Sequence, residues 1–324
     1  LGAIILFTTL LRSQSLPLPA GFVAVALMSA LIAVMLGDTL ASVLAGMIGG
    51  DFSVALVTHG LPLHAAFGLG GWLSLAAMGV SYRLVSMFIV APERTGVLPR
   101  TTFGGALVAL ALLCAALGVL IAQNAPWPTG LGLAALAAVA AVVAYLGDIV
   151  ALYRGRRRPK LELHMAAAIG AFAMLGLSVA ALIWSVAAAN QLGVVAAVYL
   201  LALGWLSGLG LAMLYKIVAF LTWLECFAPL MGRTPTPRVQ DLVREDRALP
   251  GFVIYFSATV LGAGAVVFDA DKLLQVAAAL QLGAVVLLVY QFYRARQLAD
   301  LPDPWRAHPR PRVLMPANRP RSFS

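Results

Sequence analysis

The feature that most constrains the fold of this chain is a series of long apolar runs that are almost free of charge. Most contain about 18 to 30 residues, enough for a helix to cross a hydrocarbon core of about 30 Å. They lack the alternation of apolar and polar residues that is typical of a membrane β-strand. The runs are Leu1–Leu11, Ala20–Leu36, His59–Val90, Phe103–Gln123, Gly130–Tyr153, Leu161–Ala188, Gly193–Phe227, Gly251–Phe268 and Leu273–Tyr293. The pattern predicts an all-α polytopic membrane protein with about nine transmembrane helices.

Composition and the two ends of the chain complete this prediction. With 62% hydrophobic and 11% charged residues, the chain has too little polar surface for a soluble protein of 324 residues. It begins inside an apolar run and without Met, so we expect its N-terminus to be truncated. We predict a transmembrane bundle over residues 1–296 and a Pro- and Arg-rich tail over residues 297–324, lying extended on a partner or on lipid headgroups.

The basic residues predict an orientation. Nearly all of the 22 Lys and Arg residues fall in loops on one side of the predicted topology, and the other side carries Lys272 alone. Under the positive-inside rule the basic side, including the C-terminal tail, faces the cytoplasm. Orientation and anionic lipid account for the net charge of +9, so we expect no nucleic-acid partner.

Two helices share an internal repeat. "GWLSLAAMGVSYRLVSMF" begins at Gly71, and "GWLSGLGLAMLYKIVAFL" begins at Gly204. In each copy a Tyr followed by a basic residue comes ten residues after the Trp. Chance similarity between apolar helices is the alternative, but the rarer Trp and Tyr favour common descent of a unit of four helices. Apart from their glycines, the two copies read as smooth helices.

Two histidines precede the first copy. His59 and His64 lie near the predicted non-cytoplasmic mouth of their helix, about 140° apart around a regular helix axis, so they cannot both face one metal unless Pro62 redirects the first turn. His64 is the stronger candidate for a metal or haem ligand, because small residues on its face would let a helix or a planar cofactor approach. The alternative is an interfacial histidine bonded to a neighbouring carbonyl.

Arg83 and Lys216 occupy equivalent places in the two repeated helices. Long basic side chains near helix ends commonly extend to the headgroups. The functional alternative is that they bind an anionic group inside the bundle, namely Asp148, Glu225 or a haem propionate.

The stretch from His64 to Phe88, together with the second copy, resembles the helices of subunit I of the haem-copper oxidases and nitric oxide reductases, in particular their poorly characterised relatives. This resemblance implies twelve helices in three pseudo-equivalent groups of four, cytoplasmic termini, a bacterial-type inner membrane, and haem or copper as cofactor. It makes the repeated helices the family's sixth and tenth. His64 falls near a family copper ligand, with His59 as an auxiliary and Arg83 and Lys216 as anion partners.

The departures from that family decide the predicted function. Phe103–Gln123 and the helix of the second copy lack the histidines that the family places there. A copper centre needs about three imidazoles, and a six-coordinate haem needs a ligand on each face. We therefore expect an accessory inner-membrane protein linked to haem, copper or quinone handling within a respiratory-type complex, and no terminal oxidase activity from this chain by itself. The alternatives are a transporter or channel built from the repeats, or a purely structural subunit.

Overall fold

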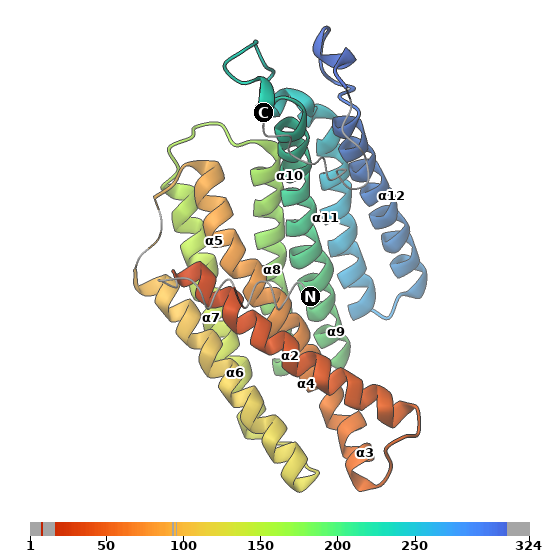
Figure 1. Ribbon diagram of the computed structural model, residues 1–324. Helices are drawn as coiled ribbons and strands as arrows, with labels where there is room; N and C mark the ends of the chain where they lie inside the picture. Colours follow the sequence, from red (N-terminus) through yellow and green to blue (C-terminus); the bar gives the residue numbers. More distant parts are fainter. Residues whose placement is uncertain (1–7, 9–16, 93, 95, 310–324) are drawn as a thin grey trace. The chain divides into compact units, whose positions relative to one another are not determined.

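The computed structural model describes residue 8, residues 17–92, residue 94 and residues 96–309, and every regular element in these residues is helical (Figure 1). Eight helices are long and apolar enough to span a membrane. They are α2 (Leu18–Leu44), a compound helix (Asp51–Ile89), α6 (Val97–Gln123), α7 (Pro128–Arg154), α8 (Leu163–Ala187), a second compound helix (Gln191–Cys226), α11 (Glu245–Val267) and α12 (Asp271–Arg296). The chain is an all-α polytopic membrane protein in contact with the lipid bilayer. Apart from Thr8, the run predicted at Leu1–Leu11 lies outside the described residues.

The two compound helices are irregular, and the expectation of smooth repeats was wrong. The first consists of α3 (Asp51–Ala55), the π-helical η1 (Leu56–Gly60), α4 (Leu61–Ala65), the π-helical η2 (Ala66–Ser74) and α5 (Leu75–Ile89). The second consists of α9 (Gln191–Tyr199), the π-helical η3 (Leu200–Ser207) and α10 (Gly208–Cys226). Each Gly-Trp-Leu-Ser sequence therefore closes a π-helical segment. Apolar periodicity does not reveal such a segment, because it adds only a slight widening to a continuous helix.

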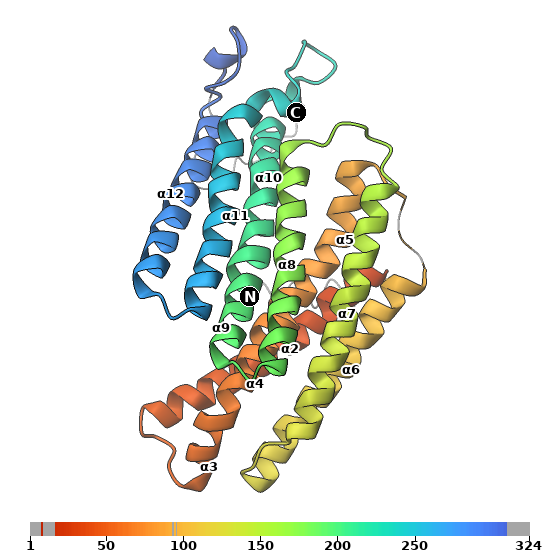
Figure 2. The same cartoon turned by 180° about the vertical axis from the view of Figure 1, so that it is seen from behind.

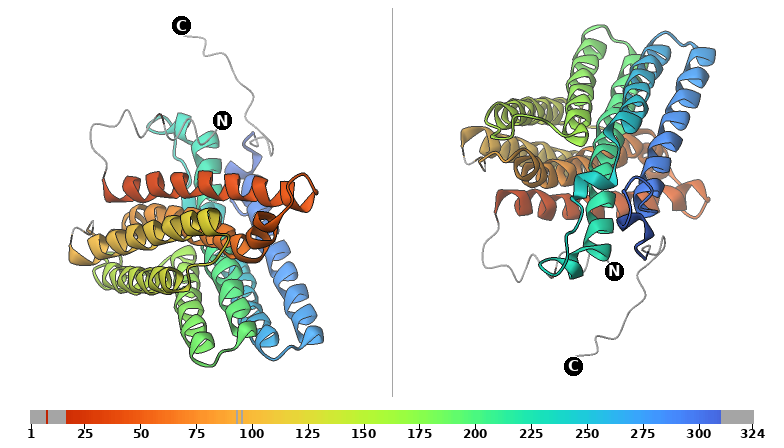
Figure 3. Two further views of the ribbon diagram at one scale, coloured as in Figure 1. Left: turned by 90° about the horizontal axis from the view of Figure 1, so that it is seen from below. Right: turned by 90° about the horizontal axis from the view of Figure 1, so that it is seen from above.

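The described chain divides into two compact units, with residues up to Leu161 in unit 1 and residues from Glu162 in unit 2. Unit 1 contains α2, the first compound helix, α6 and α7, while unit 2 contains α8, the second compound helix, α11 and α12. In each unit the first helix packs along the compound helix, and the last two helices form an antiparallel pair. Figure 2 shows the pair α11 and α12, and the left view of Figure 3 shows α2 beside the helices that follow it. The predicted repeat of four helices thus matches the order and the pairing of helices within each unit.

The repeated motif has a local structural role in both units. A Cβ at Gly71 would collide with Ser29 on α2, and one at Gly204 would lie 2.6 Å from the Cβ of Met174 on α8. Glycine therefore permits the close approach of the first helix in each unit. Ser74 Oγ donates to the carbonyl of the residue five positions earlier at 2.5 Å, and Ser207 Oγ makes the equivalent bond at 2.9 Å. These hydroxyls bond carbonyls of the π-helical segment inside the helix itself.

The start of the predicted tail folds onto unit 2 rather than lying extended. Leu298 and Leu301 are fully buried in a cluster with Phe227, Leu242 and Cys226. Short 3-10 helices around this cluster are η4 (Ala228–Leu230), η5 (Val239–Leu242) and η6 (Trp305–Ala307). Two leucines placed soon after α12 supply the apolar area that holds this segment in place. Residues 310–324 of the tail lie outside the described residues.

Candidate functional site

His64 lies on α4 and is held against α2 by both a hydrogen bond and packing. Its ring Nδ1 is 2.9 Å from the carbonyl oxygen of Ala33. A Cβ added at Gly37, one helical turn further along α2, would lie 2.9 Å from His64 Cε1, so the imidazole occupies the space that this glycine leaves open. The neighbouring Leu63 is buried with Leu36 of α2, which fixes the position of α4.

The hydrogen bond defines the tautomer of His64. A backbone carbonyl only accepts, so Nδ1 must carry the proton and donate it to Ala33 O. In the neutral ring Nε2 then holds a lone pair, and this atom forms no hydrogen bond with the described part of the chain. The ring is half-buried. The carbonyl-bonded histidine, which the sequence offered as an alternative, is thus the observed arrangement, and it leaves one nitrogen available as a ligand.

His59 lies elsewhere on the same compound helix, in η1. Because the helix begins at Asp51, His59 and His64 are well inside it rather than at its mouth, which corrects the expected position. The 140° separation assumed a regular helix, and the π-helical turn Leu56–Gly60 removes that premise. Pro62 is accommodated directly after this turn, and the helix continues through it. Among the described residues, no group of three His, Cys, Asp or Glu side chains is placed to hold a metal ion.

Lys216 is bound to a carboxylate that the sequence did not nominate. Its Nζ donates to Glu162 Oε2, and both side chains are less than one-fifth exposed. Glu162 Oε2 also lies 3.6 Å from Nδ1 of His164, whose side chain is 1% exposed. Glu162 comes directly before α8, where a carboxylate is favoured by the helix dipole. Its position just before an apolar run, close to a histidine, was the signal available in the sequence.

The other predicted anions have their own partners. Asp148 on α7 is fully buried, and its Oδ1 accepts from Arg94 Nε at 2.7 Å. Glu225 Oε2 lies 3.1 Å from Arg296 Nη1. Neither carboxylate is therefore the partner of Lys216.

Arg83 differs from Lys216 in its surroundings, although the two occupy equivalent places in the repeat. It lies on the exposed side of α5, whereas the adjacent Tyr82 is buried. The Tyr82 ring packs edge-on against Tyr145 of α7, with ring centroids 5.4 Å apart. In the second copy Tyr215 is also buried and packs against Phe292 of the last helix. The tyrosines of the two copies share a packing role, whereas the basic residues that follow them differ in exposure.

A polar chain in the core of unit 2 was not anticipated from the sequence. Tyr199 Oη donates to Gln281 Oε1 at 2.7 Å, and Gln281 Nε2 donates to Thr259 Oγ1 at 2.8 Å. These bonds connect α9, α12 and α11, so polar groups in the membrane-spanning part are satisfied by one another. Gln281, the Gln in the middle of the apolar run of α12, was the signal that could have indicated this cluster.

Comparisons with protein-family models, with curated proteins and with solved structures found no match to this chain. The candidate site is therefore characterised by the structure alone. Its central feature is His64, an oriented imidazole whose Nε2 holds a lone pair in the neutral ring.

Proposed function

We propose that this protein is an accessory subunit of a membrane redox complex, built on a scaffold like that of haem-copper oxidase subunit I, and that it handles haem or copper through His64. The observation that carries this proposal is the hydrogen bond from His64 Nδ1 to Ala33 O. Histidines that bind metals usually donate their other ring N–H to a carbonyl or a carboxylate, which fixes the tautomer and orients the ring.

The tautomer of His64 distinguishes haem and copper from quinone as its cofactor. Haem iron and copper bind a nitrogen lone pair, which neutral His64 offers at Nε2. A quinone carbonyl is an acceptor and needs a donor, and in this tautomer the donor of His64 is already engaged by Ala33. The arrangement thus favours haem or copper over quinone.

The lack of further converging metal ligands among the described residues supports cofactor handling rather than catalysis. Within the described residues no three metal-binding side chains converge, so His64 supplies one ligand and a partner or another part of the complex supplies the others. His59 is our candidate for the auxiliary ligand. Arg83 and Lys216 are our candidate partners for a haem propionate, and Lys216 would have to release Glu162 to take this role.

The experiment is an absorption spectrum and metal analysis of freshly purified full-length protein, followed by titration with haem and with Cu(I). We expect a Soret band or bound copper that is lost in His64→Ala and weakened in Gly37→Ala, whose added methyl would displace the ring. His308→Ala is the matched control, since His308 lies in the tail segment of unit 2 and should leave the signal unchanged. Absence of both signals in the wild type, before and after titration, would refute the proposal.

The second candidate is a transporter built from the two repeats. It is favoured by the π-helical segments η2 and η3, which occupy equivalent places in the two units, because π-helical segments are frequent at functional sites. Proteoliposomes loaded with a pH-sensitive dye would test it for proton flux. A flux that His64→Ala leaves intact and Gln281→Leu abolishes would favour this function over cofactor handling.

A further inference from the structure

A cationic surface lies at one end of unit 1, where α5 ends, α6 begins and α7 ends. We call it the basic end, and it consists of Arg100, Arg154, Arg156, Arg157 and Lys160. All five residues are exposed, and none forms an ion pair with another described residue. Two described carboxylates are close in sequence to these residues, and both are engaged: Asp148 is fully buried and accepts from Arg94, and Glu162 accepts from Lys216. Among the described residues, the five basic side chains therefore have no carboxylate partner.

The segment that carries most of this charge is held in place by the end of α5. The backbone N–H of Arg157 donates to Val90 O at 3.3 Å, and that of Arg158 donates to Ile89 O at 3.4 Å. Arg156 Nη1 also donates to the carbonyl of Tyr153 at 2.9 Å. Binding an anion to a segment that is already positioned costs less conformational entropy than ordering a free loop.

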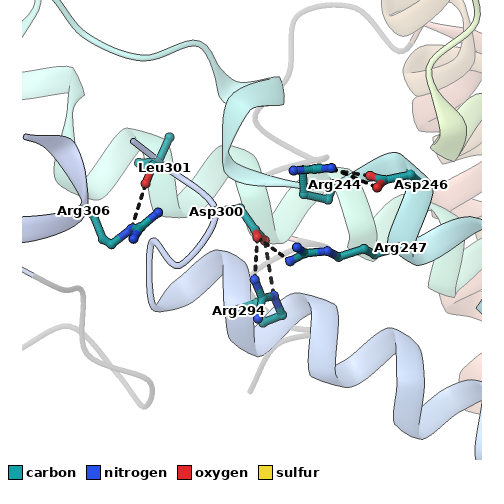
Figure 4. A network of polar contacts seen from close by, with 7 residues as sticks. All are labelled: Arg244, Asp246, Arg247, Arg294, Asp300, Leu301 and Arg306. Atoms are coloured by element: carbon teal, nitrogen blue, oxygen red, sulfur yellow. Dashed lines mark hydrogen bonds and ion pairs between the residues drawn. The ribbon is translucent and has the colours of Figure 1, made fainter. Parts of the chain in front are cut away.

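The arginines of unit 2 contrast with this surface because many of them are neutralised within the unit. Asp300 accepts from Arg247 at 2.8 Å and from Arg294 at 2.5 Å, and Asp246 accepts from Arg244 (Figure 4). Arg-rich sequence alone would assign equal anion affinity to both units. Among the described residues, the basic end of unit 1 is thus a group of five exposed basic side chains without a carboxylate partner, whereas the arginines of unit 2 in Figure 4 are bound to Asp246 and Asp300 or to a backbone carbonyl.

The position of the basic end identifies its ligand. It joins the ends of three membrane-spanning helices, where the hydrocarbon core gives way to lipid headgroups. Clusters of Lys and Arg at this depth attract anionic lipids, and guanidinium groups bind phosphate oxygens through paired N–H donors. We propose that the basic end of unit 1 binds the headgroups of anionic phospholipids in preference to zwitterionic ones. This inference rests on the membrane fold and is independent of the role of His64.

The test measures lipids bound to the full chain by native mass spectrometry, after adding equimolar phosphatidylglycerol and phosphatidylcholine in detergent. The test variant carries R154Q, R156Q, R157Q and K160Q. The control carries R233Q, R238Q, R244Q and R247Q, which removes the same charge from exposed positions of unit 2. At about fivefold in affinity for each basic residue near a surface, the phosphatidylglycerol preference should fall at least about fivefold in the test variant and stay within about twofold in the control.

Four results would overturn the inference. An equal loss in both variants would assign the preference to net charge, and no loss in either would remove the basic end from lipid binding. Displacement of phosphatidylglycerol by millimolar inorganic phosphate would identify a site for soluble anions instead. If the test variant does not elute as a folded protein, the salt dependence of the wild type provides the test. The phosphatidylglycerol preference of the wild type must fall as salt is raised, because salt screens charge interactions at a surface. A preference that persists in high salt contradicts the proposal.

Discussion

Gly70 and Gly71 are adjacent in η2, yet the structure predicts opposite effects when each is replaced by Ala. A Cβ at Gly71 would collide with Ser29 Oγ and would lie 2.8 Å from Ser29 Cβ and 3.1 Å from Leu110 Cδ2. A Cβ at Gly70 would meet nothing within 4 Å. The comparison isolates the close approach of α2, because both positions have the same π-helical backbone.

The magnitudes follow from two opposing contributions. Ala in place of Gly within a helix stabilises by about 1 kcal/mol. Overpacking a close contact costs about 1 to 3 kcal/mol, and here the obstacle includes Ser29 Cβ, which cannot rotate away. We expect Gly70→Ala to stabilise the protein by up to about 1 kcal/mol, and Gly71→Ala to destabilise it by about 1 to 2 kcal/mol.

The assay is reversible unfolding in mixed micelles, with the free energy of unfolding measured by circular dichroism as the fraction of denaturing detergent rises. Ser29→Gly combined with Gly71→Ala should recover most of the loss, because it removes the two Ser29 atoms that the new methyl meets and leaves only the looser contact with Leu110 Cδ2. If Gly71→Ala is as stable as Gly70→Ala, or if Ser29→Gly gives no recovery, the close packing of α2 on η2 is refuted.

Three further perturbations test other parts of the structure. Gln281→Leu removes the hydrogen bonds to Tyr199 and Thr259, so it should lower the free energy of unfolding by about 1 to 2 kcal/mol in the same assay, and unchanged stability would contradict the polar chain. Arg94→Gln leaves the buried Asp148 carboxylate without its ion pair and should cost about 3 to 5 kcal/mol, whereas the double variant with Asp148→Asn should be less destabilised. Alkaline phosphatase fused to the C-terminus should be inactive in a bacterial host if this end is cytoplasmic, and an active fusion would reverse the proposed orientation.

The fold class could be predicted from the sequence because a bilayer imposes it on long apolar runs. Without water in the hydrocarbon core, each run must satisfy its own backbone groups as a helix, so counting the runs predicts the spans. The ends were less well predicted. The run expected at Ala20–Leu36 is the helix Leu18–Leu44, and the helix expected over His59–Val90 begins at Asp51, because Leu40 and Leu56, which lie outside the predicted runs, are buried in one apolar cluster that includes both helices.

The candidate site was predicted only in part. His64 could be nominated because an ionisable side chain within an apolar run is costly to bury and is therefore often functional. The tautomer of His64 could not be predicted from the sequence. It depends on Ala33 and Gly37 of another helix, and neither residue is distinctive in the sequence. Lys216 was expected to meet an anion, but its choice of Glu162 over Asp148 and Glu225 is a matter of distance in three dimensions.

The sequence by itself determined that the chain is helical and membrane-embedded, and that one motif occurs twice. Both properties are local, since they depend on the polarity of consecutive residues and on short patterns. Only the tertiary structure decided what the motif does, because the clash that each glycine avoids involves an atom on a separate helix. It also decided which arginines are paired with a carboxylate, because an ion pair depends on whether a carboxylate lies within reach, and sequence spacing does not report that distance.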